Sequence, residues 1–395
     1  MRQAIQLGVG LFLAIAATYC PGQTAAAAEN QRQTALALEQ QGKNVEAEAA
    51  WRAYLKAHPS SSEPYAHLGL LEARQEHYKE AVPLYRKALA IGPEVPGLRL
   101  DLGLALFKGG DLKEAIQEFS RLEKNHPGDQ QLTILIGMAY YGLAEYSQAI
   151  PYLKEAAAHD AQNLPLRLAL AHSCLRSKQN QCVLDVYHEI LMLNAESAEA
   201  DMLAGEALDA MKDSAGAVQQ FRAAVEANPK EPDAHFGLGY LLWIKKQYQE
   251  AASEFQAEIA NDPDHIQAML YLADADIQLN QIADARPLLE KVLKLDPSLG
   301  LAHLDMGIVY TKDGRNEDAM RELTEAAKLM PDEVNVHWRL GRLYRTMGKK
   351  EEAKAEFDIA SKLNSAADAE VYKKIAEGHA RPTPPQQPAA TPAEK

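Results

Sequence analysis

Histidine side chains bind metals and transfer protons readily, and this sequence contains twelve of them. His235, His303 and His337 lie 68 and 34 residues apart. Residues spaced in this way fall on separate structural elements and cannot share one metal ion, whose ligands must lie roughly 2 Å from it. We therefore interpret these histidines as packing residues and predict no metal site.

The other arrangements that support catalysis are also missing from the sequence. No pair of cysteines has zinc-finger spacing, and no glycine-rich loop follows a strand pattern to hold phosphate. No serine or cysteine lies in a nucleophile-elbow motif. Neighbouring carboxylates such as Asp274 and Asp276 are expected on solvated helix faces. The sequence thus predicts no cofactor and no enzymatic activity.

Cys174 and Cys182 are near one another in the sequence. Cys174 falls late in one predicted helix and Cys182 early in the next, with a short polar turn between them. Such a hairpin brings two side chains across a helix crossing, and an oxidising compartment permits a disulfide there. The alternative is a pair of reduced, buried cysteines that act as small apolar residues.

An internal repeat of 34 residues organises the elements that carry these side chains. No insertion or deletion interrupts its register over residues 28–367. The ten blocks are 28–61, 62–95, 96–129, 130–163, 164–197, 198–231, 232–265, 266–299, 300–333 and 334–367. The eighth place of every block is Gly or Ala, the twentieth is Ala in all but one, and the twenty-fourth is large and apolar. Each block therefore predicts two amphipathic helices that cross closely at their small residues.

This pattern resembles the tetratricopeptide repeat family. A near-complete example of the family motif is formed by Tyr65, Leu68, Gly69, Ala81, Tyr85, Ala88 and Pro93. The resemblance implies an all-α chain, an α-solenoid (right-handed superhelix) of ten 34-residue helix-turn-helix repeats. It also implies a concave wall, made by the first helices, that binds a partner polypeptide.

In that family the second, fifth, ninth and twelfth places of each block face the concave wall. Here these places are largely apolar or aromatic, with a basic end and an acidic stretch at Glu206, Asp209 and Asp233. The predicted peptide-binding groove residues are Leu100, Leu104, Phe107, Ile134, Met138, Tyr141, Leu168, His172, Phe236, Tyr240, Trp243, Trp338, Arg342 and Arg345. No ninth place holds Asn, which disfavours the family's clamp for a C-terminal carboxylate and its asparagine ladder. The alternative for individual fifth-place residues is burial between neighbouring first helices.

The two ends of the chain differ from the repeats. Residues 1–28 combine an early charge, an apolar run and small residues, which is typical of a secretory signal peptide. Lipidation of Cys20 is an alternative that the bulky Tyr19 disfavours. Residues 368–378 predict a separate capping helix, with Asp368 as its N-cap and Gly378 at its end. Residues 379–395 predict a Pro-rich disordered tail.

Composition limits the class of partner. The formal net charge is −14, from 41 basic and 55 acidic residues. That balance argues against nucleic acid as a partner, because phosphate binding needs a concentrated basic surface. The apolar run near the N-terminus is too short to span a membrane. We expect an exported protein, periplasmic or secreted, that binds a protein or peptide.

Three functions remain open at this stage. The first is a non-catalytic protein–protein interaction scaffold in an envelope assembly, secretion or polysaccharide system. The second is a holdase-like periplasmic chaperone for unfolded exported chains. The third is a regulatory subunit of an envelope enzyme. Fold-level resemblance does not decide among them.

Overall fold

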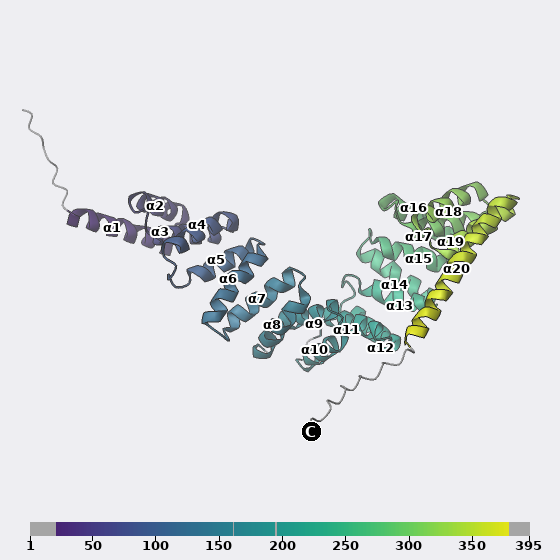
Figure 1. Cartoon of the computed structure of the whole chain (residues 1–395), viewed down its shortest axis with the longest axis horizontal. Helices are drawn as coiled ribbons and strands as arrows, with labels where there is room; N and C mark the ends of the chain where they lie inside the picture. Colours follow the sequence, from purple (N-terminus) through teal and green to yellow (C-terminus); the bar gives the residue numbers. More distant parts are fainter. Residues whose placement is uncertain (1–20, 161, 194–195, 379–395) are drawn as a thin grey trace, which may run out of the picture. The chain divides into compact units, whose positions relative to one another are not determined.

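The computed structural model describes residues 21–160, 162–193 and 196–378, and every regular element in these ranges is an α-helix. Twenty helices follow one another, coloured along the chain in Figure 1. The first helices of the successive pairs are α1 (Pro21–Gln40), α3 (Glu63–Arg74), α5 (Leu98–Lys108), α7 (Gln130–Gly142), α9 (Leu164–Arg176), α11 (Ala198–Ala210), α13 (Ala234–Ile244), α15 (Ile266–Gln278), α17 (Gly300–Lys312) and α19 (Val334–Thr346). The second helices are α2 (Asn44–Ala57), α4 (Tyr78–Ile91), α6 (Leu112–Asn125), α8 (Tyr146–His159), α10 (Asn180–Met192), α12 (Ser214–Ala227), α14 (Tyr248–Asn261), α16 (Ile282–Leu295), α18 (Asn316–Leu329) and α20 (Lys350–Gly378). The predicted all-α architecture of consecutive helix pairs is confirmed.

The chain forms two compact units, residues 1–186 and 187–395, and the division falls within α10. In each unit, successive helices pack against one another in chain order. No helix among the described residues combines the length and the apolar composition that crossing a bilayer requires.

Small residues at fixed places let the two helices of a pair approach closely. Alanines at the twentieth place are fully buried from Ala47 to Ala319. A Cβ added to Gly69 or Gly239, both at the eighth place, would lie 2.9 or 2.8 Å from the aromatic ring of the same pair's second helix. Since real Cβ atoms do not come this close, only glycine permits the aromatic side chain to fill the crossing.

The first helices are covered on several sides. α15, for example, packs against α13, α14, α16 and α17, and its consecutive residues Ala275, Asp276 and Ile277 are all buried. A first helix therefore has only a narrow face left for solvent or for a partner, and that face determines where a site can lie.

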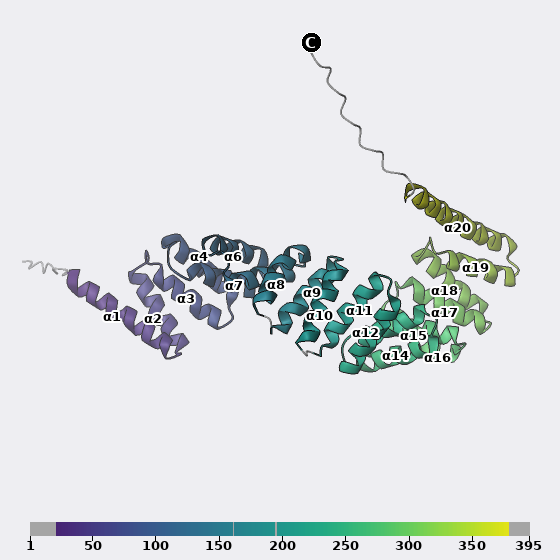
Figure 2. The same cartoon turned by 90° about the horizontal axis from the view of Figure 1, so that it is seen from below.

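The prediction of a separate capping helix over 368–378 is wrong. Residues Lys350–Gly378 form one continuous helix, α20, drawn in yellow in Figures 1 and 2. Asp368 lies inside this helix and does not cap its start. The physical reason is the absence of Gly and Pro between Lys350 and Glu377, together with Ala366 and Ala367, which favour continued helix. Gly378 is the last described residue of α20.

The N-terminal helix also extends beyond the repeat pattern. Residues from Pro21 onward are already helical in α1, ahead of the first predicted block at Ala28. Most of the predicted signal peptide (residues 1–20, with Cys20) and the predicted Pro-rich tail (residues 379–395) lie outside the described residues.

Candidate functional site

Three of the predicted groove residues form a continuous aromatic surface in the second unit. Phe236, Tyr240 and Trp243 lie on one face of α13, with ring centroids 6.2 Å apart for each successive pair. Tyr271 of α15 packs edge-on against Tyr240 at 5.3 Å and against Trp243 at 5.1 Å. We call Phe236, Tyr240, Trp243 and Tyr271 the aromatic surface. The first three are half-buried, so part of each ring is supported by the core and part faces outward.

Tyr271 was not identified from the sequence because it occupies the sixth place of its block, outside the places that face the wall in the family. The prediction that the neighbouring carboxylates of Asp274 and Asp276 lie on solvated helix faces is wrong. Asp274 accepts a hydrogen bond from Trp243 Nε1 at 2.6 Å, and Asp276 is only 4% exposed. Burial, reinforced by the carboxylate of Asp284, raises the pKa of Asp276 to about 6. Asp276 is buried because the neighbouring helices enclose α15.

A cavity of about 400 Å³ opens beside the aromatic surface, between α11 and α13. Its apolar wall includes Phe236, Tyr240 and Met202. Glu206, Asp209 and Asp233, the acidic stretch identified in the sequence, line it as well, and no lysine or arginine does. We call these three carboxylates the acidic rim. Such a cavity fits an apolar side chain accompanied by positive charge.

The start of α13, which carries the aromatic surface, is fixed by a buried carboxylate. Glu258 of α14 is 1% exposed and accepts hydrogen bonds from the backbone N–H groups of Asp233 (3.1 Å) and Phe236 (3.0 Å). These N–H groups have no partner within the helix, and the helix dipole favours a negative charge at this end. Glu258 thereby orients the first turn of α13 and the ring of Phe236.

Asp233, Glu258 and His265 come within 4.8 Å of one another and have the atom types of a metal site. The hydrogen bonds of His265 argue against one. His265 Nδ1 accepts from Ala268 N–H at 3.0 Å, so the proton of the neutral ring lies on Nε2, which contacts Asp233 Oδ1 at 2.8 Å. A metal at Nε2 would require that proton on Nδ1, where it would oppose the Ala268 N–H. The cluster serves instead to cap α13 and α15.

The predicted basic end consists of Trp338, Arg339, Arg342 and Arg345 on α19, of which Arg339 is half-buried and the other three are exposed. Trp338 and Arg342 line a second cavity of about 270 Å³ against α17, together with Arg339. Arg345 is absent from its lining, and its guanidinium lies 5.8 Å from the ring centroid of Phe357. The structure thus brings three of the four residues of the predicted basic end together.

The predicted groove residues of the first unit are all half-buried. Leu100, Leu104 and Phe107 of α5 pack against the core of that unit. Leu104 also lines a cavity of about 230 Å³, beside Asp101 and Lys108. They are therefore only partly available to a partner.

The rest of this group lies on α7 and α9: Ile134, Met138, Tyr141, Leu168 and His172. His172 meets the rings of Tyr141 and Tyr146 edge-on at 5.6 and 5.5 Å. Burial, together with the Arg176 guanidinium, lowers the pKa of His172, so its neutral form is favoured. The ring therefore acts here as an aromatic contact.

Burial between neighbouring first helices, the alternative for fifth-place residues, applies in the later repeats. Leu270 and Leu304 at the fifth place, and Ile308 at the ninth, are at most 7% exposed and belong to one core cluster. The aromatic surface and the cavity on α19 are consequently separated by core residues along the first helices α15 and α17.

The fourth-place histidines connect the two helices of their pairs. His235, His303 and His337 contact Glu254, Glu322 and Glu356 at 2.6–2.7 Å, and Arg99 contacts Glu118 in the same way. Each glutamate stands at the twenty-third place of its block. The predicted packing role was thus incomplete, because these residues also make polar contacts between helices.

Cys174 and Cys182 are joined by a disulfide, with their Cα atoms 5.9 Å apart. The bond connects α9 to the first turn of α10 across the turn between them. Cys174 is fully buried, so the covalent link lies inside the fifth repeat.

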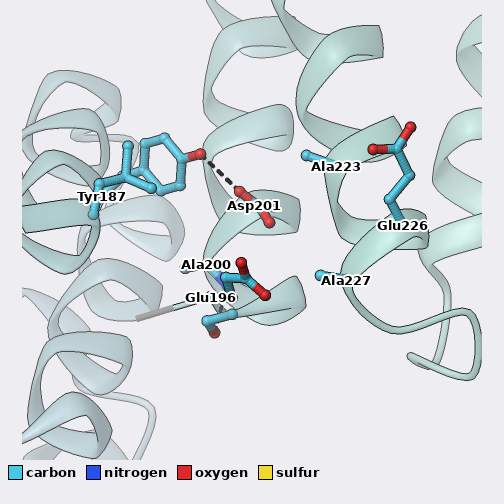
Figure 3. A pocket seen from close by; sticks show the side chains of 9 residues that line it. Tyr187, Glu196, Ala200, Asp201, Ala223, Glu226 and Ala227 are labelled. Carbon is cyan, nitrogen blue, oxygen red and sulfur yellow. Dashed lines mark hydrogen bonds between the residues drawn. The ribbon is translucent and has the colours of Figure 1, made fainter. Parts of the chain in front are cut away.

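A larger cavity, about 550 Å³, lies at the ends of α10, α11 and α12 (Figure 3). Tyr187 donates a hydrogen bond to Asp201 Oδ1 at 2.7 Å, and burial raises the pKa of that carboxyl. Glu226 lies across the cavity from Tyr187 and Glu196 lies beside Ala200, whereas Ala200, Ala223 and Ala227 contribute little side chain (Figure 3). Tyr187 is the one aromatic residue in its lining, in contrast to the continuous aromatic surface of α13 and α15.

Comparison with known proteins places this chain among repeat proteins. Two tetratricopeptide repeat models match it, one over residues 32–96, 68–130 and 202–266 and the other over 242–304 and 310–377. The TPR repeat-containing protein YpiA of Bacillus subtilis (strain 168) is 26% identical over 225 residues, 55% of this chain and 52% of YpiA. BBSome complex member BBS4 of Bos taurus is 22% identical over 258 residues, 65% of this chain and 48% of BBS4. This chain therefore spans about half the length of these two relatives.

Solved structures with detectable similarity include MamA from Desulfovibrio magneticus RS-1, at 20% identity and a TM-score of 0.40, over 44% of this chain and 99% of that one. YrrB, described as a TPR protein with an unusual peptide-binding site, is 18% identical with a TM-score of 0.40, over 48% of this chain and 97% of that one. The family models, the recurring small and aromatic places, and the twenty paired helices agree: the chain belongs to the tetratricopeptide repeat family.

Proposed function

We propose that this protein is a non-catalytic scaffold that binds a segment of a partner polypeptide on the first helices of its second unit. The observation that carries the proposal is the aromatic surface of α13 and α15 beside a cavity bordered by the acidic rim. Half-exposed aromatic rings with a cavity between helices are the features that anchor peptides in grooves of this kind.

The expected affinity follows from the area available. A segment that buries roughly 500 Å² of apolar surface gains about 12 kcal/mol at about 25 cal/mol per Å². Lost translational, rotational and side-chain freedom costs about 4–15 kcal/mol. At the low end of that cost about 8 kcal/mol remains, which corresponds to a micromolar dissociation constant, and any higher cost gives weaker binding. Binding of this strength exchanges readily, which suits a scaffold.

Export belongs to the same proposal. The residues that support it are Arg2, the apolar run that follows it, and the small residues up to Ala28. The disulfide between Cys174 and Cys182 supports it independently, because disulfides persist in oxidising compartments. We place the protein in the periplasm or outside the cell, in an envelope assembly, secretion or polysaccharide system.

The test is affinity co-purification from envelope extract with two charge-reversed variants. Glu206→Lys with Asp209→Lys changes the acidic rim, whereas Glu196→Lys with Glu226→Lys makes the same change in charge at the larger cavity of the same unit. We expect one stoichiometric partner that the rim variant loses and the control retains. Retention by both variants would contradict the proposed site. Capture of many unrelated unfolded chains would favour a holdase, and an enzyme as sole partner would favour a regulatory subunit.

A further inference from the structure

The cavity between α17 and α19 differs from every other part of the proposed binding surface in its charge. Lys312 of α17 and Arg339 and Arg342 of α19 line it, in a chain whose formal net charge is −14. Its volume of about 270 Å³ suits one side chain and is below the range of whole small-molecule sites. We call this cavity the basic pocket.

The three cations of the basic pocket are paired with neutral groups. Lys312 Nζ donates to Asn280 Oδ1 at 2.9 Å, and Arg339 Nε donates to Asn335 Oδ1 at 3.0 Å. The Arg342 guanidinium lies over the ring of Trp338, 4.6 Å from its centroid. Among the residues that the structure describes, none of the three forms an ion pair. The pocket therefore holds a positive charge that its own hydrogen bonds do not neutralise.

Two carboxyl groups, Asp305 and Asp274, lie within electrostatic range of Arg339, and burial weakens the effect of Asp305, the stronger of the two. Asp305 is 7% exposed, and burial raises its pKa well above the usual range, against the opposing influence of Arg339. A carboxyl that favours its neutral form compensates little of the arginine charge. Desolvation in turn lowers the pKa of Arg339, which means that a further anion at this place would be favourable.

Trp338 provides an apolar platform at the opening. It is 44% exposed, the most exposed aromatic side chain among the large hydrophobic residues of the described chain. The stacked Arg342 has its planar donors held in one orientation, which reduces the entropy lost when it binds a carboxylate. Trp and Arg are both enriched among the residues that dominate binding energy at interfaces.

We propose that the basic pocket binds the carboxylate of an aspartate or glutamate side chain in the partner segment. This inference rests on the proposed function, since the same segment occupies the aromatic surface. The acidic rim lies on α11 and at the start of α13, and the basic pocket lies between α17 and α19, further along the same unit. These helices are labelled in Figure 1. The bound segment accordingly carries positive charge at the acidic rim and negative charge at the basic pocket. This pairing of charges fixes the orientation of the segment along the first helices.

The three tryptophans make a direct test possible. Trp51 is fully buried in the first repeat, Trp243 lies in the aromatic surface, and Trp338 lies in the basic pocket. Each gives one indole N–H signal in a ¹⁵N-labelled protein, assigned by single Trp→Phe substitutions. The probes are acetyl-leucyl-glutamyl-leucine amide, its glutaminyl counterpart, and acetyl-leucyl-glutaminyl-leucine with a free C-terminal carboxylate.

We expect the glutamyl amide to shift the Trp338 signal saturably, at least tenfold more tightly than the glutaminyl amide. Arg342→Gln should weaken this binding at least tenfold, whereas Arg345→Gln, outside the pocket, should leave it unchanged. Equal binding of the two amides, or an unchanged response in Arg342→Gln, would overturn the inference. Preference for the free C-terminal carboxylate would overturn the assignment to a side chain.

The outcome is separable from that of the proposed function. Loss of selectivity at Trp338, with co-purification still dependent on Glu206 and Asp209, would reject the basic pocket alone. Selective binding at Trp338 without any partner that depends on the acidic rim would reject the proposed scaffold site and keep the basic pocket.

Discussion

Trp243 Nε1 in α13 donates a hydrogen bond to Asp274 Oδ2 in α15, at 2.6 Å, and so links the first helices of two successive repeats. The bond holds the indole ring in the aromatic surface while one of its faces packs near Tyr271. A hydrogen bond to a charged acceptor contributes about 1.5–3 kcal/mol.

Trp243→Phe removes the donor and keeps an aromatic ring. We expect the free energy of unfolding to fall by about 2 kcal/mol, measured by urea denaturation followed by circular dichroism. Trp338→Phe is the matched control, because Trp338 is exposed and donates no hydrogen bond among the described residues. An equal loss in both variants would show that the Asp274 bond contributes nothing specific.

Glu258→Ala leaves the backbone N–H groups of Asp233 and Phe236 without their acceptor at the start of α13. A hydrogen bond to a charged group contributes about 1.5–3 kcal/mol, so we expect the loss of these two part-buried bonds to lower the free energy of unfolding by at least about 2 kcal/mol in the same assay. Glu250→Ala on the same helix is the control, since its contact with Arg222 is exposed and worth less than about 1 kcal/mol. If the two variants are equally stable, Glu258 does not hold α13.

Asp276 makes stability depend on pH in a definite direction. Its folded-state pKa of about 6 exceeds the ordinary value of 3.8, so the folded protein binds the proton more tightly than the unfolded chain does. Stability therefore falls as pH rises from about 3.8 to about 6 and stays lower above that. Asp276→Asn should raise the free energy of unfolding by up to about 3 kcal/mol at pH 7.5, and the gain should vanish toward pH 4. A gain that is the same at both pH values would contradict the assignment.

The disulfide closes a short loop, since the two cysteines are eight residues apart. Restricting such a loop in the unfolded chain contributes about 2–3 kcal/mol by the chain-entropy model. Reduction, or replacement of both cysteines by alanine, should lower stability by about that amount in the first unit. Mass spectrometry of the non-reduced protein checks the bond itself, as two free thiols would add two mass units.

The sequence was sufficient for the helical pairs and for much of the candidate site. Periodic small and aromatic places specify the crossings, and the twelfth-place Trp243 was identifiable because its neighbours in register are apolar too. Tyr271 and Asp276 were not identifiable from the sequence, since the residues of one helix do not reveal how many other helices enclose it. Glu258 resembles any solvated glutamate until the N-terminus of α13 is placed beside it.

The contacts between fourth and twenty-third places could have been found from the sequence. A basic residue at the fourth place accompanies Glu at the twenty-third in four blocks, as with His303 and Glu322, and neither place shows the pattern alone. The continuity of α20 could not have been found from the sequence. A capping signal at Asp368 competes with continued helix there, and the surrounding structure decides which effect is stronger.

The bridge between Cys174 and Cys182 has a consequence for how this protein opens. In an array of repeats each helix pair is stabilised mainly by its nearest neighbours, so partial unfolding spreads from one helix pair to the next. Within the fifth repeat the two helices remain covalently tethered when their noncovalent contacts are lost. Refolding of this repeat begins from two helices that are already held together. We therefore expect partial unfolding to stop at the fifth repeat and refolding to start there.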